Sequence, residues 1–114
     1  MVKSRRKHEL TAENIFSVLR EHSDMLKKLS VRKIGVFGYY VRGEQKLRSD
    51  IDFLVEFEKP TFDNFMDLVF SLEKYLGRKV DVITEGSLSP YIRPFVEKDV
   101  RWYEVCRSVF EAYP

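Results

Sequence analysis

The sequence has little cysteine and no long apolar run. Cys106 is the single cysteine, so an internal disulfide is excluded, and this usage agrees with a reducing compartment. No apolar segment approaches the roughly 18 residues that suggest a membrane span. The first ten residues include basic side chains but no apolar core of a secretory signal. We therefore expect a cytoplasmic protein that does not bind a membrane.

The residues that are present have the composition of one folded domain. Of the 114 residues, 44% are hydrophobic and 33% are charged, which is typical of a globular domain rather than a disordered chain. The net charge of +2 is uneven, because Lys3, Arg5, Arg6 and Lys7 gather near the start. We expect residues 1–10 to form a flexible basic tail and residues 11–114 a single domain.

Nucleic acid is not expected as a partner. The body of the chain has no basic stripe interleaved with aromatic residues, which sequence-specific binding would require. The basic tail could still make the chain a nucleic-acid-associated module, which we rank third among the functions considered. Deletion of residues 1–8 and the salt dependence of binding would test it.

Helical and strand-like stretches alternate along the chain. Apolar spacing predicts a helix from Thr11 to Leu29 and another from Thr61 to Gly77, and Ser89 with Pro90 suits the start of a third. His22 lies on the apolar stripe of the first helix and is expected to be a packed or partly exposed histidine, not a ligand. Strands are expected at residues 31–38, 51–57, 79–84 and 100–105. This order predicts an α+β fold, a small mixed sheet with helices packed against it.

Two aspartates stand at the entry of the strand predicted at residues 51–57. Alternation along a strand directs Asp50 and Asp52 to the same face. Adjacent carboxylates repel each other, so a compensating group is expected, and Mg²⁺ prefers such hard oxygen ligands. The alternative is that Asp50 ends a turn and Asp52 is solvated at a sheet edge.

Asp81 is a third carboxylate, in the middle of a predicted strand where aspartate is disfavoured. If this strand neighbours the strand of Asp52, three carboxylates converge at one end of the sheet. Two metal ions held there could bind the attacking and leaving oxygens of an in-line displacement. The alternative is an ion pair of Asp81 with Lys79 or Arg78 at an edge.

The spacing of these residues resembles the signature of the minimal nucleotidyltransferases of the DNA polymerase beta superfamily. That signature is Gly-Ser, ten residues, Asp-x-Asp, and a later strand aspartate. Here Gly38 and Tyr39 are followed by residues 40–49, by D-I-D from Asp50, and by Asp81 in K-V-D-V-I-T. The glycine is also physically suitable, because it lets backbone N–H groups approach a triphosphate closely.

The resemblance implies a nucleotidyltransferase fold and a probable enzyme that transfers a nucleoside monophosphate, typically AMP from ATP or another NTP, to a hydroxyl. Its catalytic and metal-binding residues would be Asp50, Asp52 and Asp81, with two Mg²⁺ ions and Mn²⁺ as a substitute. Asp81 would also help to deprotonate the acceptor. Gly38 would make room for the phosphates.

The resemblance also implies a partner. Many of these small proteins are antitoxins that adenylylate a tyrosine on a HEPN-domain toxin. A HEPN-domain protein is therefore the implied partner, and the chain would be the antitoxin of a toxin–antitoxin pair.

One position departs from the signature, because Tyr39 stands where the family has serine. Tyr39 and Arg42 are the further candidates for nucleotide binding, although an arginine in a turn, such as Arg42, is more often a surface ion-pair partner. A tyrosine hydroxyl lies about 6.5 Å from its Cα and a serine hydroxyl about 2.4 Å. Loss of one transition-state donor costs about 10²–10³ in rate. The alternative function is therefore a weakened or inactive protein of this fold that binds its partner as an antitoxin or scaffold.

Overall fold

The computed structural model describes residues 10–38, 41, 43 and 50–105. Tyr39, Arg42 and Cys106 lie outside these residues. Within the described part of the chain, no helix has the length and apolar character needed to cross a membrane.

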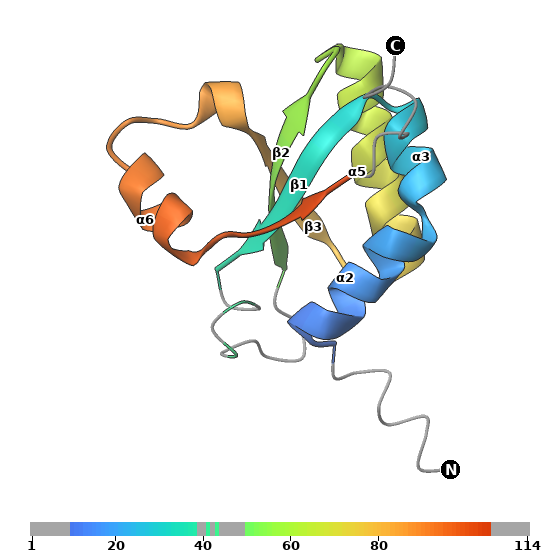
Figure 1. The fold of residues 1–114 in the computed structure, drawn as a ribbon, viewed down its shortest axis with the longest axis horizontal. Helices are drawn as coiled ribbons and strands as arrows, with labels where there is room; N and C mark the ends of the chain where they lie inside the picture. The colour runs from blue at the N-terminus through green and yellow to red at the C-terminus, as the bar shows by residue number, and fades with distance from the viewer. Residues whose placement is uncertain (1–9, 39–40, 42, 44–49, 106–114) are drawn as a thin grey trace, which may run out of the picture.

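A four-stranded sheet with the order β3-β2-β1-β4 forms the centre of the fold (Figure 1). Its strands are β1 (Val31–Phe37), β2 (Ile51–Phe57), β3 (Val80–Thr84) and β4 (Arg101–Glu104). β1 is antiparallel to both of its neighbours, whereas β2 and β3 are parallel. The predicted α+β class with a small mixed sheet is confirmed.

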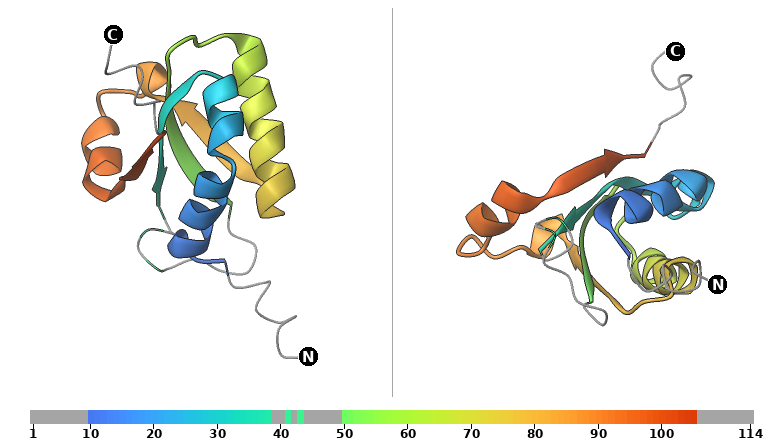
Figure 2. Two further views of the ribbon diagram at one scale, coloured as in Figure 1. Left: turned by 45° about the vertical axis from the view of Figure 1, so that its right-hand side comes forward. Right: turned by 90° about the horizontal axis from the view of Figure 1, so that it is seen from below.

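Three helices cover one face of the sheet (Figure 2): α2 (Ala12–Glu21), α3 (Ser23–Lys28) and α5 (Phe62–Leu76). α5 connects β2 to β3, which allows these two strands to run parallel. It begins at Thr61, whose hydroxyl accepts a hydrogen bond from the Asn64 N–H at 3.0 Å. It ends at Gly77, whose φ of 67° is the left-handed conformation that glycine adopts without strain. The main core lies between these helices and the sheet.

The opposite face of the sheet is covered by η1 (Glu85–Ser87) and α6 (Arg93–Asp99) (Figure 2). Leu54 of β2, Leu88 and Val96 of α6 form a second, smaller core there, with Trp102 of β4 packed against it. The sheet therefore has a fully covered face and a partly covered one.

The helix predicted from Thr11 to Leu29 is broken at His22. The backbone N–H of His22 still bonds to the carbonyls of the last turn of α2, but its ψ of 30° ends the helix. Its Nδ1 lies 3.0 Å from the Val18 carbonyl oxygen, and its ring stacks on Tyr75 with centroids 3.7 Å apart. The prediction of one continuous helix was wrong, and that of a packed histidine is confirmed.

The third helix begins later than predicted. Ser89 closes a turn instead of capping a helix, because its hydroxyl accepts from the Tyr91 N–H at 3.1 Å and its carbonyl accepts from the Arg93 N–H at 2.9 Å. α6 then starts at Arg93 with Pro94 in its first turn, where a missing N–H costs nothing. The predicted start at Ser89 and Pro90 was wrong, whereas the final edge strand is confirmed as β4.

Candidate active site

The candidate site lies where β2 and β3 begin. In the parallel register, the Cα of Asp52 is the partner of the Cα of Asp81. Neighbouring strands lie about 4.8 Å apart and paired residues share a face, so both carboxylates project from the same side of the sheet. Ile51 and Phe53 are fully buried in the core beneath the helices. Asp52 therefore projects from the partly covered face, and Asp81 with it.

Gly38 brings the backbone after β1 close to the Asp52 carboxylate. It has a φ of 82°, and a Cβ built on it would lie 2.6 Å from Oδ2 of Asp52. The positive φ favours glycine, and any side chain at this position would displace the Asp52 carboxylate. The turn continues with a hydrogen bond from the Val41 N–H to the Gly38 carbonyl at 3.1 Å. Gly38 is thus beside Asp52, as a phosphate-binding turn would need to be.

The carboxylates differ in exposure. Asp52 is half-buried, whereas Asp50 and Asp81 are exposed. Among the described residues, Asp81 has no ion-pair partner within 4 Å, so the alternative pairing with Lys79 is not observed there.

The three aspartates do not form a closed metal cage. Asp50 precedes the first residue of β2, and no three Asp, Glu, His or Cys side chains of the described residues are grouped so that they could hold a metal ion. The pair of Asp52 and Asp81 nevertheless supplies the oxygen ligands that Mg²⁺ prefers, on one face and beside an open glycine turn. These two residues fit a magnesium site, and the full three-aspartate site stays a prediction.

Glu73 of α5 helps to place Asp81. Its Oε2 accepts a hydrogen bond from the Val80 N–H at 3.1 Å, and the Ile51 N–H donates to the Lys79 carbonyl at 3.2 Å. Together these bonds fix the start of β3 beside the start of β2. Nothing in the sequence indicates the role of Glu73, because the contact depends on how α5 packs against the sheet.

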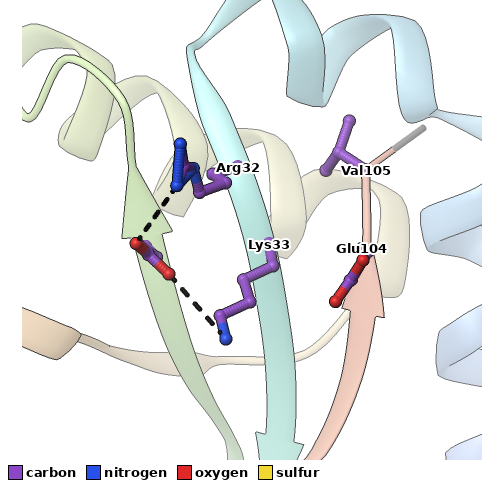
Figure 3. A pocket seen from close by; sticks show the side chains of 5 residues that line it. Arg32, Lys33, Glu104 and Val105 are labelled. Atoms are coloured by element: carbon purple, nitrogen blue, oxygen red, sulfur yellow. Dashed lines mark ion pairs between the residues drawn. The ribbon is translucent and has the colours of Figure 1, made fainter. Parts of the chain in front are cut away.

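A charged cavity lies at the other end of β1, away from the aspartates. It has a volume of about 390 Å³ and is lined by Arg32, Lys33, Glu56, Glu104 and Val105. Figure 3 shows that Arg32 and Lys33 are both directed to the same glutamate, Glu56. The N···O distance is 3.8 Å in each pair. Because Arg32 and Lys33 are both paired with Glu56 and the cavity lies away from the aspartates, this cavity is not the candidate site.

The model of the nucleotidyltransferase domain family matches residues 19–103 of this sequence. The chain belongs to that family. It is 45% identical over 93 residues to the protein adenylyltransferase MntA of Thermococcus cleftensis, a match that covers 80% of this chain and 94% of the relative. The resemblance to the minimal nucleotidyltransferases is confirmed, and the homologues support the prediction of a probable nucleotidyltransferase.

Solved structures share the fold of this nucleotidyltransferase. One that is assigned to the minimal nucleotidyltransferases superposes with a TM-score of 0.70 at 30% identity, covering 81% of this chain and 95% of the other. Another is the complex of an MNT antitoxin with a tri-AMPylated HEPN toxin from Shewanella oneidensis, with a TM-score of 0.57 at 17% identity and coverage of 86% and 76%. The second likeness concerns the fold alone.

Tyr39 and Arg42 lie outside the described residues. Their proposed contacts with a nucleotide therefore stay predictions.

Proposed function

We propose that this nucleotidyltransferase is a metal-dependent protein adenylyltransferase that transfers AMP from ATP to a hydroxyl of a HEPN-domain toxin, and that it acts as the antitoxin of that pair. The observation that carries the proposal is the register of Asp52 with Asp81 beside Gly38. The relative named protein adenylyltransferase and the AMPylated toxin in a structural neighbour support it.

In this reaction the acceptor hydroxyl oxygen attacks the α-phosphorus of ATP, and the bond from that phosphorus to the oxygen bridging to the β-phosphate breaks. Pyrophosphate leaves with the bonding electron pair. A carboxylate oxygen of Asp81 takes the proton of the hydroxyl. Asp52 and Asp81, together with Asp50, would hold Mg²⁺, whose charge would offset that of the phosphates. Gly38 admits the triphosphate because it has no side chain in front of Asp52.

The proposal is tested by AMP transfer. The purified chain is incubated with α-³²P-labelled ATP, a HEPN-domain protein, and either Mg²⁺ or Mn²⁺. We expect labelled HEPN-domain protein with the wild type, and a loss of at least about 10²-fold in Asp52→Asn and in Asp81→Asn. Asp67→Asn, an exposed carboxylate on α5, is the matched control and should retain the wild-type rate. No transfer with either cation would remove the enzymatic proposal.

The second candidate function is partner binding without catalysis, and the residue that favours it is Tyr39. In that case Asp52→Asn should leave the affinity for the HEPN-domain protein intact, and Tyr39→Ser should not create transfer. If Tyr39 only weakens an enzyme, Tyr39→Ser should raise the rate by about 10²–10³. The two functions therefore differ in the response to one substitution.

A further inference from the structure

An apolar ridge precedes and enters α6. Tyr91, Ile92 and Phe95 are 85%, 46% and 72% exposed, although all three are large hydrophobic side chains. Pro90 and Pro94, which lie between and beside them, are exposed as well. We call the three side chains of Tyr91, Ile92 and Phe95 the apolar ridge.

Arg93, the charged residue of this segment, makes its contacts within the chain. Arg93 donates from Nη2 to the Glu85 carbonyl at 3.2 Å, and its Nη1 lies 3.6 Å from the Glu85 carboxylate and 3.2 Å from that of Glu97. The polar side chain is thus used to attach α6 to η1, while the apolar ones face solvent. A segment adapted only to water would have the reverse arrangement.

The ridge is also held in a fixed shape. Its two prolines restrict φ, and the Ser89 carbonyl accepts from the backbone N–H groups of Ile92 and Arg93 at 3.2 and 2.9 Å. Val96, one residue after the ridge, is buried against Leu54 of β2. A surface that is ordered before binding loses little conformational entropy when a partner arrives.

The ridge belongs to the same side of the sheet as the candidate site. α6 packs through Val96 on the partly covered face, from which Asp52 and Asp81 project, whereas α2, α3 and α5 lie on the other face (Figures 1 and 2). A molecule that reaches the two carboxylates must therefore approach the face that α6 borders.

We infer that the apolar ridge is the docking surface for the protein that presents the acceptor hydroxyl. The inference rests on the proposed function, since a protein acceptor must be brought to the face of Asp52 and Asp81. Each aromatic side chain can bury about 150–250 Å², so the ridge offers a few hundred Å². A specific interface buries about 800 Å² per partner, so the ridge is its central anchor and not the whole contact. The occupant is a HEPN-domain protein with an apolar surface close to its acceptor hydroxyl.

The double substitution Tyr91→Ser with Phe95→Ser tests this surface in the full chain. We expect the KM for the HEPN-domain protein to rise at least tenfold, with kcat at saturating acceptor and the Kd for AMP-PNP with Mn²⁺ unchanged. Phe70→Ser is the matched control, because Phe70 is 61% exposed on α5, on the other side of the sheet. The KM of Phe70→Ser should stay within twofold of the wild-type value. Thermal melts should show that all variants are folded.

Calorimetric binding of the HEPN-domain protein to the Asp52→Asn chain separates docking from chemistry. If the chain proves inactive but binds, the ridge substitutions should still weaken the Kd at least tenfold. An unchanged KM and Kd in the double variant would overturn the docking surface while leaving adenylyl transfer intact. A HEPN-domain protein that does not bind the wild type would also overturn it. The docking surface would also be overturned if the ridge mediated self-association in sedimentation runs and its substitution did not affect binding of the acceptor protein.

Discussion

Substitution of Gly38 by alanine should damage the site more than the fold. A Cβ at this position would lie 2.6 Å from Oδ2 of Asp52, whereas ordinary contact begins at about 3.4 Å, so the carboxylate must retreat by roughly 0.8 Å. Metal–ligand distances tolerate only about 0.2 Å. We therefore expect Gly38→Ala to weaken Mn²⁺ binding, measured by calorimetry in the presence of AMP-PNP, by at least about tenfold.

The stability of this variant should change only modestly. Alanine at a φ of 82° costs roughly 1–2 kcal/mol in backbone strain, partly offset because the unfolded chain loses freedom. The Asp52 carboxylate is the end of a side chain and can rotate away, so the clash adds little. A net loss of about 1 kcal/mol corresponds to a fall in Tm of roughly 3–6 °C.

Gly77→Ala is the control for this experiment. Gly77 also has a positive φ, of 67°, but a Cβ there would meet nothing within 4 Å. It should show a similar loss in Tm and an unchanged affinity for Mn²⁺. If Gly38→Ala bound Mn²⁺ as tightly as Gly77→Ala, the reasoning that connects Gly38 to the carboxylate site would be refuted.

Three further substitutions test the surroundings of the site. Asp81→Asn should raise Tm slightly in metal-free buffer, because like charges on paired residues cost about 0.2–1 kcal/mol. It should also abolish any stabilisation by Mn²⁺. A lower Tm in metal-free buffer would contradict this expectation. Glu73→Ala should destabilise the chain by about 1–2 kcal/mol in urea unfolding, because the Val80 N–H loses its acceptor, whereas Glu73→Gln should recover most of that loss. Gly35→Ala should cost about 1–3 kcal/mol, because its Cβ would overlap Cγ2 of Val100. An unchanged urea midpoint would contradict this expectation.

The strands could be predicted from the sequence. Residues 51–57 were predicted as a strand and form β2, and the strand predicted at residues 79–84 corresponds to β3. These features depend on local patterns of side chains. The prediction of converging carboxylates assumed that β2 and β3 are neighbours. They are parallel neighbours, as the strand–helix–strand connection allows.

Other features depend on contacts between distant residues and could not be predicted. The break at His22 coincides with its stacking on Tyr75, which lies on another helix. α6 starts late because Ser89 closes a turn. Serine followed by proline is typical of a turn and also of a helix start, so the sequence alone did not distinguish the two. The Glu73–Val80 bond exists only once α5 has packed on the sheet.

The pairing of β1 with β4 has a consequence for the order in which the molecule can be completed. β1 lies between β2 and β4, so one of its edges stays open until residues 101–104 have been synthesised. Helices α2, α3 and α5 can enclose the main core before then except where Val105 completes it, and Trp102 must arrive before the smaller core around Leu54 is closed. A nascent chain would therefore acquire its carboxylate pair before the wall beside it, and the surface proposed for a protein acceptor would be complete only once β4 has paired with β1.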